Sequence, residues 1–365
     1  TGWISTDARF EPDGMRPTLR LSHRSDSKTK SESVEVETDA RGRLLVWVDR
    51  VPLDGPRGRP LTQQRTRLTI PVGQDSSEVE VVVADESGRQ SLPVLFRTGN
   101  RPGVVTKDLY VAALGVSDYQ RDALDLQYAA EDAKDIADAF EKHSDFANVH
   151  KRVLVDGQVS RAALESVREF FSQARVDDTL VLHVAGHGEV TNDGRYYFLT
   201  SDTDPDDLAK AGITFEQLES VFMGVRARRR LMLMDTCHAG DPADATAGVV
   251  AAGVSARAVS RVRRSGAPQR KRIAVMERFM DLRSTSGATV LAAASAGEFA
   301  EDSVTGGKNG VFTSAVLEAL ASTQTSGLTA NALQARVADR VAALTGGGQR
   351  PVVRQRNPVL DFPLK

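Results

Sequence analysis

Cysteine is almost absent from this chain, whose 365 residues contain a single one, Cys237. One cysteine cannot form an internal disulfide, so the chain is not a disulfide-stabilised secreted domain. We therefore expect a protein of the reducing cytoplasm. Hydrophobic residues make up 41% of the sequence and charged residues 26%, which is typical of a globular protein with a sizeable core.

Excess charge and long apolar runs are also missing. The formal net charge is −2, which gives no electrostatic reason to expect nucleic acid or an acidic membrane surface as a partner. No apolar run approaches the ~20 residues that cross a bilayer, so we expect no membrane partner. The opening "TGWISTDARF" has neither the basic start nor the apolar core of a signal peptide. Because the chain begins at Thr1, we expect a fragment or a processed product.

Residues 1–100 alternate apolar and polar side chains in short runs that Gly, Pro, Asp and Asn interrupt. Six such runs predict strands, and they are residues 18–24, 33–38, 43–53, 66–72, 78–85 and 91–98. Strands of this length and spacing predict a small β-sandwich that is immunoglobulin-like. This region contains no cluster of reactive residues, which favours a structural or partner-binding module.

A Gly/Pro-containing linker at 101–108 separates this sandwich from residues 109–365, where strand-like and helix-like patterns alternate. The expected strands are 109–116, 150–156, 178–188, 228–237 and 287–296, and the expected helices are 127–143, 160–174, 214–224, 310–322 and 329–344. Such alternation predicts an α/β domain with a mostly parallel sheet and helices on both faces. In such sheets, sites form in the loops at the carboxyl ends of the strands.

A long connector at about 241–285 lacks a periodic pattern, and we expect it to be flexible. Its second half is basic through Arg257, Arg261, Arg263, Arg264, Arg270, Lys271 and Arg272. It has no aromatic side chains for base stacking in this basic stretch, so nucleic-acid binding is a weak interpretation.

Two expected strands end in a turn that carries a reactive residue. "HVAGHG" delivers His187, and "MDTCHAG" delivers Cys237. If the strands are parallel neighbours, both residues emerge at one edge of the sheet, where an imidazole could take the proton of a thiol and produce a nucleophile. The backbone N–H groups of Gly188 and Cys237 are candidate donors to the oxyanion of an acyl-transfer intermediate.

Each of these residues also has another interpretation. A lone cysteine is often a small buried hydrophobe, and a lone histidine is often structural. His183 and His238 compete with His187 as the base. A metal-dependent hydrolase could use His183, His187, Asp235 and His238, although the sequence lacks the glutamate of the zinc-protease helix motif. A third alternative is a non-catalytic interaction module.

The region from about 108 to 345 resembles the caspase-like cysteine peptidases, in particular their bacterial and metacaspase-type members. "AGHG" resembles the turn of their catalytic histidine, and "DTCHAG" resembles their nucleophile turn. The separation, 237 − 187 = 50 residues, also suits caspases. The resemblance implies a caspase-like α/β fold and an endopeptidase in which His187 and Cys237 are catalytic. The nucleophile turn of animal caspases is absent.

The resemblance further implies a substrate pocket for Arg or Lys that is lined by Asp235, with Asp118 as a second contributor. A pocket of this kind would accept the basic residues of the connector, so all seven of these residues are candidate self-cleavage sites. The implied setting is bacterial stress, cell-death or defence signalling on protein substrates, with residues 1–100 linking the peptidase to an upstream sensor or partner. The sequence requires no cofactor. Calcium dependence stays open, because the acidic run Asp202, Asp204, Asp206 and Asp207 lacks the spacing of an EF-hand loop.

Overall fold

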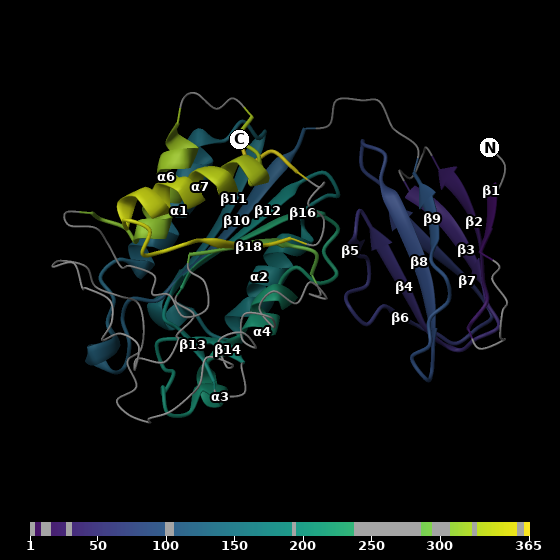
Figure 1. The fold of residues 1–365 in the computed structure, drawn as a ribbon, viewed down its shortest axis with the longest axis horizontal. Coiled ribbons are helices and arrows are strands. Elements are labelled where there is room, and N and C mark those ends of the chain that lie inside the picture. The colour runs from purple at the N-terminus through teal and green to yellow at the C-terminus, as the bar shows by residue number, and fades with distance from the viewer. Residues whose placement is uncertain are drawn as a thin grey trace.

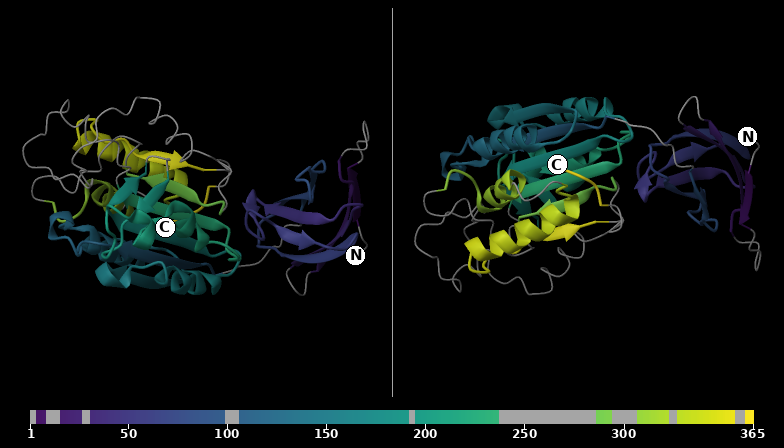
Figure 2. Two further views of the ribbon diagram at one scale, coloured as in Figure 1. Left: turned by 90° about the horizontal axis from the view of Figure 1, so that it is seen from below. Right: turned by 90° about the horizontal axis from the view of Figure 1, so that it is seen from above.

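The structure is a computed structural model, shown in Figure 1, that describes residues 4–8, 16–26, 31–98, 106–191, 195–236, 286–293, 307–322, 327–355 and 361–365. Antiparallel strands occupy the N-terminal part, and a sheet layered with helices occupies the rest. Both views in Figure 2 show the N-terminal strands as a separate lobe at one end of the molecule. No helix in the described ranges is long and apolar enough to span a membrane.

Two antiparallel sheets form the N-terminal lobe. The first has the order β1 (Ile4–Ala8), β2 (Leu19–Asp26), β3 (Ser31–Glu37) and β7 (Arg65–Pro71). The second has the order β5 (Val51–Pro52), β4 (Gly42–Val48), β8 (Glu78–Asp85) and β9 (Val94–Arg97), with β6 (Arg59–Leu61) also paired to β4. Alternate residues of both sheets, such as Val34 and Val81, share one apolar cluster. The lobe is therefore a two-layer β-sandwich.

The expected strand at 43–53 is instead a hairpin of β4 and β5. Asp49 and Arg50 have φ values of 51° and 64°, and Val48 pairs directly with Val51. Positive φ at both central residues is the geometry of a tight hairpin turn. "VDRV" lacks the Asn-Gly or Asp-Gly signature of such turns, which is why the sequence pattern missed it. The immunoglobulin-like assignment stays a prediction, as does the linker at 101–108, because residues 99–105 lie outside the described residues.

The central sheet of the second part has six strands. Their order is β11 (Asn148–Val155), β10 (Asp108–Gly115), β12 (Thr179–Gly186), β16 (Arg229–Thr236), β17 (Thr289–Ala292) and β18 (Val352–Arg354). Every neighbouring pair is parallel except β17 and β18. The prediction of a mostly parallel sheet is confirmed. β18 was not predicted, since three residues are too few to show a period.

Helices cover both faces of this sheet, as predicted. α1 (Ala129–His143), α6 (Val311–Ala321) and α7 (Ala330–Leu344) pack on one face, and α2 (Ala163–Ser172) and α4 (Phe215–Ser220) on the other (Figure 1). The central strands are buried on both sides: Leu231 and Leu233 face the first set, while Met232 and Met234 face the second. This double burial explains the unbroken apolar run of β16.

Smaller elements lie around the carboxyl ends of the strands. A three-stranded antiparallel sheet contains β13 (Gly188–Val190), β14 (Tyr196–Phe198) and β15 (Ile213–Thr214). The short helix α3 (Leu208–Ala211) precedes β15, and two 3₁₀ turns, η1 (Asp122–Leu124) and η2 (Asp156–Gln158), follow β10 and β11. These elements are two to four residues long, which is too short to show a periodic pattern in the sequence.

The chain changes direction between β10 and β12. From β10 it runs through α1 to β11 on one side, and from there through α2 to β12 on the other side of β10. The loop 116–126 after β10 and the strands after β12 pack against one apolar cluster at the carboxyl ends of these two strands. This is the place where open α/β sheets bind their ligands.

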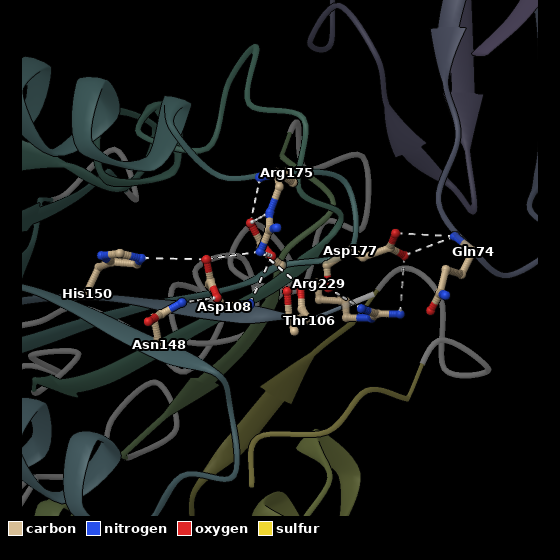
Figure 3. A network of polar contacts seen from close by, with 9 residues as sticks. Gln74, Thr106, Asp108, Asn148, His150, Arg175, Asp177 and Arg229 are labelled. Atoms are coloured by element: carbon tan, nitrogen blue, oxygen red, sulfur yellow. Dashed lines mark hydrogen bonds and ion pairs between the residues drawn. The ribbon is translucent and has the colours of Figure 1, made fainter. Parts of the chain in front are cut away.

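The sandwich contacts the opposite, amino-terminal edge of the central sheet. Arg228, only 8% exposed, donates to the Ser77 hydroxyl at 2.8 Å and to the carbonyl of Pro71, and its Nη1 lies 3.6 Å from the Asp49 carboxylate. Figure 3 shows a second link, in which the Asp177 carboxylate accepts the backbone N–H of Gln74 at 3.2 Å. Burial lowers the pKa of Arg228, and the Asp49 carboxylate partly offsets this. A buried guanidinium thus joins the sandwich to the central sheet.

A second network, also drawn in Figure 3, fastens the entry to β10. Arg175 donates to the carbonyl of Thr106 and to the carboxylate of Asp178, and its Nη2 lies 3.0 Å from Asp108. Asp108 also accepts from Asn148 of β11. These contacts tie the segment that arrives from the sandwich to the first two strands of the sheet.

The Arg228 contact predicts that the two parts unfold together. Arg228→Ala should lower the unfolding free energy by about 2–5 kcal/mol, because it leaves buried acceptors and a carboxylate without their donor. We expect a single calorimetric transition for the unaltered protein and two for this variant. Arg226→Ala, a change at an exposed arginine two residues earlier, is the matched control. Identical melting curves for the two variants would contradict a stabilising interface.

Candidate active site

His187 lies between the end of β12 and the start of β13, at the carboxyl edge of the central sheet. Gly186, which precedes it, has a φ of 147°, and a Cβ there would come within 3.0 Å of the Tyr119 hydroxyl and the Phe198 ring. Only glycine fits this conformation and this space. His187 itself is 4% exposed. The strand therefore ends in a sharp turn that places an imidazole in a closely packed position.

The loop 116–126, between β10 and α1, holds the ring of His187. The Nε2 atom lies 2.8 Å from the carbonyl oxygen of Leu124. A carbonyl oxygen only accepts, so Nε2 carries the hydrogen and the lone pair of the neutral ring is on Nδ1. The carbonyl also stabilises the positive charge of a protonated ring. The contact with Leu124 thus makes Nδ1 the basic nitrogen of the neutral His187 ring.

Asp156 fixes the start of this loop. It follows β11 with a φ of 51°, and its Oδ1 accepts the backbone N–H groups of Ser117 at 2.8 Å and Asp118 at 3.0 Å. Ser117 in turn accepts the N–H of Ala130 in the first turn of α1. The loop is therefore anchored to β11 and α1 through polar contacts that its own sequence does not reveal.

The direction of the Gly188 backbone N–H follows from the pairing of β13 with β14. Gly188 pairs with Phe198 across β13 and β14, and the N–H of Leu199 donates to the carbonyl of His187 next to this pair. In an antiparallel ladder, that pattern makes Gly188 and Phe198 a non-hydrogen-bonded pair, whose backbone groups face away from each other. The N–H of Gly188 is therefore directed away from β14.

Cys237 and His238 lie outside the described residues, but the residue before Cys237 does not. Thr236 ends β16 and pairs with Gly186, the residue before His187. Its side chain is buried, and its hydroxyl lies 2.8 Å from the hydroxyl of Tyr196 in β14. The strands that lead to His187 and to Cys237 are thus parallel neighbours that end in register.

Asp235 lies on the opposite face of the sheet from Thr236, toward α6. It is fully buried, and its Oδ2 accepts the hydroxyl of Thr313 at 2.6 Å and the Thr313 N–H at 3.2 Å. His183, also fully buried, has its Nε2 3.4 Å from the same hydroxyl. Asp235, His183 and the first turn of α6 therefore form one polar cluster within the helix-covered core.

Asp118 is exposed in the loop that follows β10. It shares the carboxyl edge of the sheet with His187 and Asp235, because β10, β12 and β16 are consecutive neighbours. The backbone N–H of Asp118 donates to Asp156, and the carboxylate of Asp235 accepts from Thr313. Both carboxylates therefore lie at the expected edge, one at the surface and the other inside.

The acidic run after β14 contacts the loop 116–126. In this loop, Nη2 of Arg121 lies 2.8 Å from Asp204 and 3.2 Å from Asp206. All three side chains are about half exposed or more, so these ion pairs contribute little stability. Within the described part of the chain, no three His, Cys, Asp or Glu side chains gather as metal ligands. The connector at 241–285 with its basic residues lies outside that part.

Comparison with known proteins identifies the family. The caspase domain model of peptidase family C14 matches residues 110–363, well over half of the chain. This chain belongs to the caspase domain family. The caspase domain supports cysteine peptidase activity in general terms. The predicted caspase-like fold is confirmed for the region that the match covers.

Protein GSU0716 from Geobacter sulfurreducens, known from a crystal structure, is similar to this chain at 16% sequence identity and a TM-score of 0.47, with 68% of this chain and 92% of that chain covered. No curated protein matches the chain.

Two contributors to this caspase domain site were not found from sequence. Leu124 acts through a backbone carbonyl, which no side-chain pattern reveals. Tyr119 is buried against His187, with ring centroids 5.1 Å apart, yet in the sequence it reads as one more polar residue of a loop. The Gly residues at 186 and 188 were the available signal that backbone approaches closely here.

Proposed function

We propose that this caspase domain is a cysteine endopeptidase that uses His187 and Cys237 as a catalytic dyad. The supporting observation is the orientation of His187 at the end of β12, with Nε2 bound to the Leu124 carbonyl, beside a strand whose next residue is Cys237. The oriented imidazole leaves Nδ1 as the basic atom. The family match supports the same reaction class.

The reaction follows from the roles of these groups. Nδ1 of His187 takes the thiol proton of Cys237, and the thiolate attacks the carbonyl carbon of the scissile peptide bond. The N–H groups of Gly188 and Cys237 donate to the resulting oxyanion. The imidazolium, stabilised by the Leu124 carbonyl, then protonates the leaving amine. A water molecule, activated by the same ring, hydrolyses the thioester and regenerates the free thiol.

The proposed substrates are proteins cleaved after Arg or Lys. Two carboxylates support this specificity: Asp118 is exposed in the loop after β10, and Asp235 is the last residue but one of the strand that precedes Cys237. The contact of Asp235 with Thr313 means that a basic substrate side chain would share this carboxylate with the first turn of α6. A buried carboxylate needs partners, and a substrate cation would add a second one.

The wider role is also part of the proposal. The β-sandwich would connect the peptidase to an upstream partner, and the setting would be bacterial stress, cell-death or defence signalling. The metal-dependent alternative is less well supported, because His183 contacts Thr313 in the core while His187 contacts the loop 116–126. A non-catalytic module would not require the imidazole ring of His187 to be fixed in one orientation.

The dyad is tested by single and double substitutions. Cys237→Ala and His187→Ala should each lower kcat by about 10³-fold or more, and the double variant should be hardly worse, because the two residues act as a unit. Peptide hydrolysis is measured with and without a chelator and with and without iodoacetamide. His238→Ala is the control and should retain far more activity. Substantial turnover by Cys237→Ala, or loss of activity with the chelator alone, would overturn the mechanism.

Specificity is tested on paired peptides that differ only in Arg, Lys, Asp or Leu before the scissile bond. Asp235→Asn and Asp118→Asn should each reduce kcat/KM for the basic peptides. For Asp235→Asn, the loss of transition-state stabilisation should be about 2 kcal/mol or more. Thr313→Val is the control: it removes the hydroxyl on Asp235 and keeps the carboxylate, so the preference for basic residues should persist. A wild-type preference for Asp or Leu would rule out the acidic pocket.

Self-cleavage is tested in the connector. We expect purified wild-type protein to cut itself after one of the seven basic residues between 257 and 272, while Cys237→Ala stays intact, because the same thiol performs the cut. Intact-mass measurement over time identifies the bond. Equal cutting of both proteins would indicate a contaminating protease, and no cutting of an active wild type would show that maturation is not required.

A further inference from the structure

We infer that Tyr119 is a positioning residue that fixes the backbone of the catalytic histidine, an inference that rests on the proposed function. The hydroxyl of Tyr119 accepts the N–H of His187 at 3.1 Å. Tyr119 is 3% exposed and His187 is 4% exposed, so water does not readily replace this acceptor. The two rings also pack at a tilt of 47°.

Two contacts of His187 come from the loop 116–126 and act on different parts of the residue. Tyr119 holds the backbone N–H, and Leu124 holds Nε2 of the ring. With the backbone and the far end of the side chain both fixed, the ring has one orientation, in which Nδ1 keeps its direction. Small displacements of a catalytic group cost large factors in rate, so this double contact has a catalytic consequence.

The neighbouring glycine provides an independent observation. A Cβ at Gly186 would sit 3.0 Å from the Tyr119 hydroxyl oxygen, closer than ordinary contact. The space that this glycine leaves open is the space through which the hydroxyl reaches the next residue of the chain. Gly186 and Tyr119 are therefore complementary in shape as well as joined through His187.

Tyr119 is itself held from the backbone side. Its N–H donates to the carboxylate of Asp125 at 2.9 Å, and the N–H of Gln120 donates to the carbonyl of Ser201. Asp125 is exposed, so its replacement should leave the core intact. This contact offers a milder way to loosen the same tyrosine.

Alkylation of the thiol reports on the dyad without any substrate. Since Cys237 is the only cysteine, the rate of its reaction with iodoacetamide against pH gives the apparent pKa of this one thiol. In wild type we expect a pKa below the ~8.5 of a free thiol, because the imidazole stabilises the thiolate. Tyr119→Phe should raise it by about one unit and lower kcat by about 10- to 100-fold, with little change in KM.

Matched variants separate positioning from stability. Tyr110→Phe removes a hydroxyl from another buried tyrosine, at the amino end of β10, and should leave the thiol pKa and kcat unchanged. Asp125→Ala should shift the thiol pKa in the same direction as Tyr119→Phe but by less, while Asp125→Asn, which keeps an acceptor, should behave as wild type. These two exposed-site variants apply even if Tyr119→Phe folds poorly.

The outcomes are distinguishable. A lowered thiol pKa in wild type that persists in Tyr119→Phe and Asp125→Ala would overturn the positioning role while leaving the proposed function intact, even if Tyr119→Phe melts at a lower temperature. A wild-type thiol that titrates as free cysteine, together with peptide cleavage by Cys237→Ala, would overturn the proposed function itself. The expected shift in both variants, with Tyr110→Phe unchanged, supports the inference.

Discussion

The hydrogen bond between Nε2 of His187 and the carbonyl of Leu124 is the contact on which the proposed chemistry depends. It decides which ring nitrogen carries the hydrogen, and so which one can receive a proton from a thiol. It also places a partial negative charge beside the ring when the ring becomes cationic. Without it, a histidine at a strand end would have no defined catalytic direction.

The topology of the sheet makes this contact possible. Because β10 and β12 are neighbours in the sheet, the loop after β10 lies beside the residue that follows β12. Asp156, at the end of β11 on the other side of β10, holds the start of the loop. Three consecutive strand ends thus cooperate to orient one side chain, while β16 on the far side of β12 leads to Cys237.

Sequence patterns predicted the parts of this structure that depend on burial. β12 and β16 are apolar on both faces, and the helices α1, α6 and α7 show an apolar stripe. The order of apolar residues along the chain is therefore enough to predict these strands and helices. The patterns failed where backbone geometry decides. The turn at Asp49 and Arg50, the positive φ of Asp156 and the carbonyl of Leu124 depend on conformations that those residue types seldom signal. For Asp235 the sequence indicated a carboxylate near the site but not its hydrogen bonds to Thr313.

The tautomer of His187 is the most direct measure of this account. Protein labelled with ¹⁵N in its histidines would show the protonated nitrogen of each neutral ring by NMR, and a His187→Gln sample would identify the signal among the six histidines. The account predicts a hydrogen on Nε2 and none on Nδ1 above the pKa of the ring. A neutral His187 that carries its hydrogen on Nδ1 would contradict the contact with Leu124 and the catalytic role derived from it.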